Sequence, residues 1–123
     1  MKIKLKMTRI EMKGVATVVQ NCCNALSGAD FVAVQYRDAL SGLLLKLAAR
    51  MPVLKKKNSL TLTDLEALAL FDCLNDLVER MPPLEMGVSY TILAEIDRQR
   101  MSYVSLMMGN LRAEKPTLLT EKH

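Results

Sequence analysis

The side chains able to perform chemistry are few in this chain, and their spacing does not favour a catalytic or metal site. The single histidine is His123, the last residue of the sequence, which excludes most histidine-based acid–base and triad chemistry. Cys22, Cys23 and Cys73 lack the paired spacing that structural zinc sites use. We therefore expect no metal site and no cofactor, and we expect that the protein is not an enzyme.

Three carboxylates, those of Asp72, Asp76 and Glu79, share one face of a predicted helix. Carboxylates on bundle helices hold metal ions when a Glu-x-x-His motif accompanies them and the ligands point inward. Here no histidine is nearby and the acids lie opposite the apolar stripe, so we interpret them as a solvated face. The sequence also contains no glycine-rich phosphate loop and no nucleophile elbow.

One charged residue falls inside an apolar stripe. Arg100 lies between Ile96 and Tyr103 on the stripe of the last predicted helix. Arginine commonly buries its aliphatic stem at such a position and keeps its guanidinium in water. The alternative is that Arg100 lies in an interface and pairs with a carboxylate from another helix.

The cysteines and the absence of sorting signals indicate a compartment. Adjacent Cys22 and Cys23 point in different directions on a helix, so they are poor disulfide partners, and an odd thiol count favours free thiols. The basic opening at residues 2–6 does not lead into an apolar core with a cleavage site. No apolar run is long enough to span a bilayer. We expect a cytoplasmic protein without a membrane span.

Three Ser/Thr-x-x-acid capping boxes predict helix starts, because hydroxyl and carboxylate satisfy the orphan N–H groups there. The boxes pair Thr8 with Glu11, Ser27 with Asp30, and Thr63 with Glu66, and Thr61 with Asp64 competes with the third. The first two also carry hydrophobic staples, from Met7 to Met12 and from Leu26 to Phe31. The second box has an alternative, in which Gly28 ends the first helix in a left-handed conformation and Asp30 is the cap.

Apolar periodicity predicts helices over about 9–26, 30–51, 64–81 and 88–112. The expected fold class is all-α: an antiparallel four-helix bundle in a single domain over residues 1–123. The main variant is a bundle that is completed by dimerisation. Residues 52–62 are interpreted as a linker and residues 114–123 as a loose tail. No internal repeat is apparent.

The first residues have the period of a strand. Lysines alternate with Ile3, Leu5 and Met7, giving one charged and one apolar face. A lone strand does not persist in water, so we expect an arm that pairs with another chain or caps the bundle, with the acidic face at 72–79 as its complement. Two alternatives are a frayed leader, and a strand that continues to Met12 with the helix starting after Gly14.

Apolar residues outside the main stripes predict more burial than one four-helix core provides, hence self-association or a partner groove. The interaction candidates, with the apolar edge of the arm and Arg100 included, are Ile3, Leu5, Met7, Phe31, Leu45, Leu65, Leu68, Tyr90, Arg100, Met101 and Met108.

Charge is divided unevenly along the chain. Residues 1–57 carry eleven basic and three acidic groups, and the remaining residues carry six basic and ten acidic groups. The main hypothesis is a non-enzymatic, self-associating protein–protein interaction or assembly module. The alternative is a nucleic-acid-associated accessory protein that uses the basic half. The phosphate-contact candidates under this alternative are Lys2, Lys4, Lys6, Lys55, Lys56 and Lys57.

Overall fold

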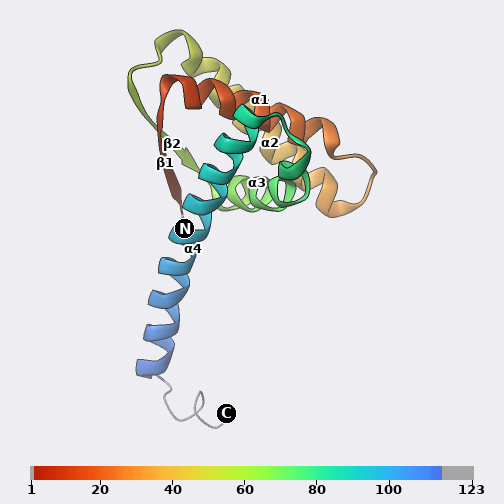
Figure 1. Ribbon diagram of the computed structural model, residues 1–123. Coiled ribbons are helices and arrows are strands. Elements are labelled where there is room, and N and C mark those ends of the chain that lie inside the picture. Colours follow the sequence, from red (N-terminus) through yellow and green to blue (C-terminus); the bar gives the residue numbers. More distant parts are fainter. Residues whose placement is uncertain (1, 115–123) are drawn as a thin grey trace.

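The structure is a computed structural model that describes residues 2–114, with side chains as far as residue 100. Within these residues the chain is mostly helical and carries a small antiparallel sheet near its N-terminus (Figure 1). The elements in chain order are β1 (Ile3–Thr8), α1 (Arg9–Ala25), α2 (Phe31–Arg50), β2 (Lys57–Leu62), α3 (Asp64–Leu77) and α4 (Pro83–Glu114), with the short 3₁₀ turns η1 (Met51–Val53) and η2 (Val78–Arg80). Of the predicted tail at 114–123, Glu114 is the last residue of α4 and the others lie outside the described residues.

The N-terminal strand is confirmed, but its partner is not the one expected. β1 pairs antiparallel with β2 of the same chain, so it is neither a frayed leader nor an arm reaching another chain. The interpretation of residues 52–62 as a linker is therefore wrong for residues 57–62, which form β2, while residues 54–56 do connect η1 to that strand. The Lys-Asn-Ser start of β2 contains poor strand formers. The alternation of Leu60 and Leu62 is too short to be recognised without the paired strand.

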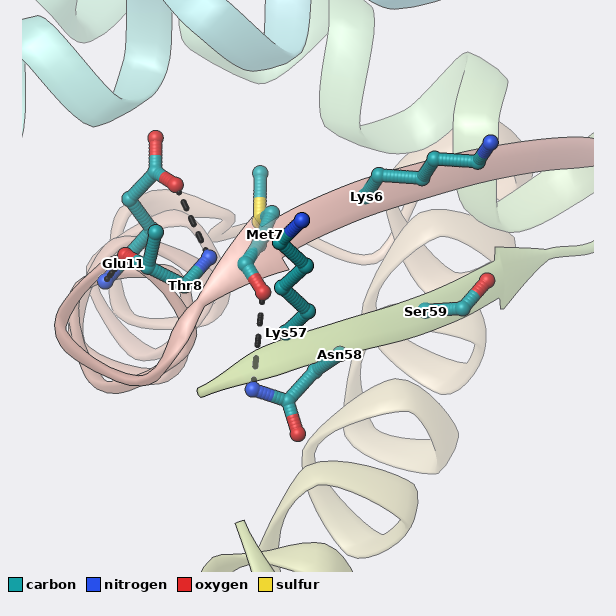
Figure 2. A pocket seen from close by; sticks show the side chains of 7 residues that line it. All are labelled: Lys6, Met7, Thr8, Glu11, Lys57, Asn58 and Ser59. Carbon is teal, nitrogen blue, oxygen red and sulfur yellow. Dashed lines mark hydrogen bonds between the residues drawn. The ribbon is translucent and has the colours of Figure 1, made fainter. Parts of the chain in front are cut away.

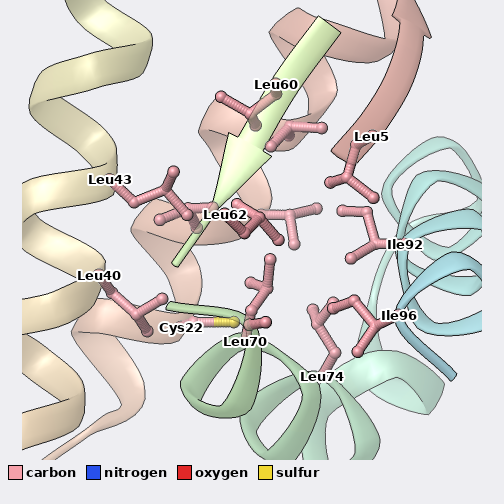
Figure 3. Packing of buried hydrophobic residues seen from close by; sticks show 14 of the residues in the cluster. Leu5, Cys22, Leu40, Leu43, Leu60, Leu62, Leu70, Leu74, Ile92 and Ile96 are labelled. Atoms are coloured by element: carbon pink, nitrogen blue, oxygen red, sulfur yellow. The ribbon is translucent and has the colours of Figure 1, made fainter. Parts of the chain in front are cut away.

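The two strands form a wall of the hydrophobic core. Ile3, Leu5 and Leu62 are fully buried, and Leu60 is 2% exposed. Figure 3 shows these strand leucines facing side chains from the helices, among them Leu40, Leu43, Leu70, Leu74, Ile92 and Ile96. The apolar edge of the predicted arm is thus part of the core of its own chain.

Two of the three predicted capping boxes are present. The Glu11 N–H donates to Thr8 Oγ1 over 3.2 Å, and the Thr8 N–H donates to Glu11 Oε1 over 2.9 Å. Thr63 and Glu66 form the same pair with the same two distances. Thr61 does not cap α3, because it lies inside β2.

The box predicted at Ser27 is wrong, and the alternative at this corner is correct in part, because Asp30 is the cap of α2 but α1 already ends at Ala25, before Gly28. Gly28 has a φ of +92°, a left-handed conformation that glycine adopts at little cost. The chain therefore changes direction after α1, and Asp30 becomes the cap of α2. Its Oδ1 accepts from the Ala33 N–H over 3.0 Å.

The last helix begins earlier than expected, at Pro83 and not near residue 88. Proline suits the first helical position because it has no N–H to leave unsatisfied there. Gly87 consequently lies inside α4. On α1, which begins directly after β1, Gly14 faces Val88, and a Cβ added at Gly14 would lie 2.9 Å from Val88 Cγ2. Gly14 therefore permits the close approach of α1 and α4.

The chain contains an internal repeat that the sequence reading missed. A strand, a capping box, a helix and a second helix occur twice in the same order. The same spacing relates Leu5 to Leu60, Thr8 to Thr63 and Glu11 to Glu66. Leu5 and Leu60 also face each other across the ribbon. The strand pairing therefore relates the two repeats by an approximate two-fold axis that passes through this pair. The helices agree, because α1 packs against α4 and α2 packs against α3.

Candidate functional site

The polar face of the two-stranded ribbon brings together residues that are distant in sequence. Because the apolar residues of both strands turn inward, the intervening residues are exposed. The register places Lys4 opposite Thr61 and Lys6 opposite Ser59. We call the exposed surface formed by Lys4, Lys6, Lys57, Ser59 and Thr61 the basic ribbon face; three of these residues appear in Figure 2. Lys4 and Lys6 of the first lysine group and Lys57 of the second thus lie on one surface, whereas Lys2, Lys55 and Lys56 lie outside the paired strands.

Within the described residues, no lysine of the basic ribbon face forms a salt bridge with a carboxylate. Two acids lie near Lys6: Glu11 at the start of α1 and Glu95 on α4. Hydrogen bonds from Arg98 and Gln99 are the main causes that lower the pKa of Glu95, and the charge of Lys6 contributes a smaller part. The carboxylate of Glu95 is therefore largely compensated by its own helix, and the face keeps its positive charge.

Both edges of the ribbon are covered by side chains from the helices. On the β1 edge, Gln99 accepts from the Lys4 N–H over 3.0 Å and donates to the Lys4 carbonyl oxygen over 2.8 Å. On the β2 edge, Lys46 Nζ donates to the Thr61 carbonyl oxygen over 3.2 Å, and Arg50 donates to the carbonyl oxygen of Ser59. These contacts occupy backbone groups that would otherwise pair with another strand. The ribbon therefore offers a face for binding, and its edges are blocked at these positions.

A pocket of about 490 Å³ opens at the end of the ribbon where β1 continues into α1 (Figure 2). Its lining consists of Lys6, Met7, Thr8, Glu11, Lys57, Asn58 and Ser59. The Glu11 carboxylate accepts from the Thr8 N–H. The Asn58 amide donates to the carbonyl oxygens of Lys55 over 2.8 Å and Met7 over 3.4 Å. These polar groups have structural partners, and the two lysines are the groups in a position to attract an anion.

The thiols of Cys22 and Cys73 meet in the core, between α1 and α3. A hydrogen bond between them raises the pKa of Cys22 and lowers that of Cys73. All three cysteines are free in the structure. Among the described residues, no group of three or more histidine, cysteine or acidic side chains is placed to hold a metal ion. A buried thiol pair of this kind packs as small apolar side chains.

The acidic face of α3 is not the complement of the N-terminal strand. Asp72 accepts a hydrogen bond of 2.5 Å from the Tyr36 hydroxyl on α2. This bond raises the pKa of Tyr36 to about 12, because deprotonation would place two anions side by side. Asp72 therefore joins α3 to α2.

Arg100 stacks on an aromatic ring. Its guanidinium carbon lies 5.0 Å from the centre of the Phe71 ring, a distance typical of a cation–π contact. The contact joins α4 to α3 near the last part of α4 whose side chains are described. Neither sequence expectation named this ring as a partner of Arg100.

The interaction candidates are distributed over several surfaces. Phe31, Leu45 and Tyr90 are 77%, 73% and 50% exposed, and Leu65 and Leu68 are 39% and 42% exposed. By contrast, Ile3, Leu5 and Met7 lie in the core and offer no surface to a partner. The side chains of Met101 and Met108 lie outside the described part of the structure.

The interaction candidates omit four exposed large apolar residues of the described part of the chain. Ile10, Val53 and Leu84 are 70%, 69% and 66% exposed, and Val32 is 53% exposed. The repeat was the signal that could have identified Ile10, because the spacing that relates Thr8 to Thr63 also relates Ile10 to Leu65. Ile10 and Leu65 each follow a capping threonine by two positions and lie on the outer side of their helix.

The chain matches no family model, no curated protein and no solved structure. None of the helices among the described residues has the length and apolar character needed to cross a membrane.

Proposed function

We propose that the protein is a non-enzymatic, self-associating assembly module whose four helices form an antiparallel bundle completed by a second copy. The observation that carries the proposal is the length of α4. This helix has 32 residues, roughly 48 Å at the usual rise, whereas the other three have 14 to 20. Figure 1 shows it continuing past the rest of the molecule.

The amino-acid sequence of the projecting part supports a protein partner. Seven of the eleven residues from 101 to 111 are apolar. A helical segment of that length is marginal in water unless packing stabilises it. Met101, Val104, Met108 and Leu111 recur at the three-and-four spacing of a heptad seam, the pattern by which two helices associate. A seam of this kind on a projecting helix favours a second copy of the same helix as the partner.

The body half of α4 carries two further exposed apolar residues. Leu84 and Tyr90 are exposed on this helix, and exposed apolar groups near an association helix enlarge the area that a partner can bury. The blocked edges of the ribbon argue against association by strand addition. The buried free thiols fit a reducing compartment, and we place the assembly in the cytoplasm on that ground.

The experiment is light scattering and sedimentation of the full chain at tens of micromolar, where an interface of about micromolar affinity is occupied. We expect an oligomer for the wild-type chain and a folded monomer for Met101→Glu/Met108→Glu, because the charges would have to be buried in the seam. The matched control is Ser102→Glu/Asn110→Glu, which adds the same two charges at polar positions and should leave the oligomer intact. A wild-type monomer, or equal effects of both double variants, would contradict the proposal.

A further inference from the structure

We propose that the basic ribbon face binds the sugar–phosphate backbone of duplex nucleic acid. The surface lies on the two strands and not on α4, so this activity is separate from self-association. The juxtaposition that carries it is the pairing of β1 with β2, which puts Lys57 diagonal to Lys6 and leaves Lys4 two residues further along the same exposed face.

The surroundings of the face extend its positive charge. Lys55 and Lys56 are exposed immediately before β2, and Arg9 is exposed immediately after β1. Arg9 also donates to the carbonyl oxygen of Leu54 over 3.3 Å, which holds the segment before β2 against the start of α1. Phosphate groups attract such a cluster through counterion release, a contribution that grows with each lysine engaged.

The shape of the face fits a duplex. Duplex DNA carries about one negative charge per 1.7 Å of its axis. A strand of six residues spans roughly 20 Å. The side-chain bonds from Gln99, Lys46 and Arg50 along both edges hold the ribbon in place, so little ordering is needed when it binds.

The chemistry of the face distinguishes a duplex from other polyanions. Ser59 lies opposite Lys6 and Thr61 lies opposite Lys4, and their hydroxyl groups can donate hydrogen bonds to phosphate oxygens. The face carries no aromatic residue, which single-stranded nucleic acid needs for base stacking. Its five residues are all polar, so it has nothing to insert into a lipid surface. Glu95, the acid that faces Lys6 from α4, is compensated by Arg98.

The test is fluorescence anisotropy with the full chain and a labelled mixed-sequence DNA duplex of about 20 base pairs, two helical turns. We expect a Kd of about 10⁻⁴ to 10⁻⁶ M that weakens steeply between about 50 and 200 mM salt. The plot of log K against log salt has a negative slope. Lys6→Gln/Lys57→Gln should make that slope less steep by about 1.8, the change expected when two phosphate contacts are lost.

The matched control is Lys13→Gln/Arg80→Gln, which removes the same charge from exposed positions outside the ribbon and should change the slope little. Lys6→Arg/Lys57→Arg should retain binding, which separates lost charge from a damaged strand. The proposal is overturned if the duplex is not bound at the lowest salt, or if the two charge-removing variants weaken binding equally. Tighter binding to a single strand or to phosphatidylserine vesicles than to the duplex would overturn it as well.

Discussion

At the scale of single residues, the same amino acid has opposite consequences at two positions of the helices. Gly14 is required by the contact of α1 with Val88, whereas Gly87 has no atom within 4 Å of the Cβ that a larger residue would add. Glycine in a helix costs about 1 kcal/mol relative to alanine. Neither role is visible in the sequence, because the neighbour of Gly14 comes from a helix far along the chain.

We therefore expect Gly14→Ala and Gly87→Ala to change the free energy of unfolding in opposite directions. Gly87→Ala should stabilise the protein by about 0.5–1 kcal/mol, and Gly14→Ala should destabilise it by about 1–2 kcal/mol through overpacking. In a Val88→Ala background the clash is removed and Gly14→Ala should become stabilising. Urea denaturation of the four variants measures this, and an unchanged effect of Gly14→Ala in the Val88→Ala background would rule out the contact.

At the scale of elements, local signals identified the four helices, although not the start of α4 at Pro83, and were insufficient for the sheet. The caps at Thr8 and Thr63 are determined by residues three positions away, so sequence spacing identifies them. The pairing of β1 with β2 depends on residues about half the chain apart, and the Lys-Asn-Ser start of β2 resembles a loop. The basic ribbon face was unpredictable for the same reason, since its two halves become one surface only through that pairing.

The threonine that caps α3 should contribute measurably to stability. Thr63→Ala removes the hydroxyl that accepts from the Glu66 N–H over 3.2 Å, and we expect a loss of about 1 kcal/mol in the free energy of unfolding. Thr61→Ala is the control, because Thr61 is exposed on the ribbon and should change stability by less than about 0.5 kcal/mol. Denaturation midpoints measure both losses. A larger loss of stability for Thr61→Ala than for Thr63→Ala would place the cap at Thr61.

At the scale of the whole molecule, two similar units share one core. Each unit contributes a strand whose inward leucines meet those of the other, with Leu5 opposite Leu60. Neither strand could be buried without the other unit, because a lone strand leaves its apolar face uncovered. The repeat escaped the sequence because only the strand and its cap resemble each other closely, while the corresponding helical positions share burial and differ in residue type.

This arrangement predicts that equivalent leucines contribute equally. Leu5→Ala and Leu60→Ala should each lower the free energy of unfolding by about 2–5 kcal/mol, as for buried leucines, because both sit at the approximate two-fold axis with 0% and 2% exposure. Lys4→Ala, on the exposed side of the same strand, should change it by less than about 0.5 kcal/mol. Since the pairing lies within one chain, the difference between Leu5→Ala and wild type should not depend on protein concentration. If β1 belonged instead to an interface between copies, dilution would change the loss caused by Leu5→Ala through mass action, and denaturation curves at two concentrations distinguish the outcomes.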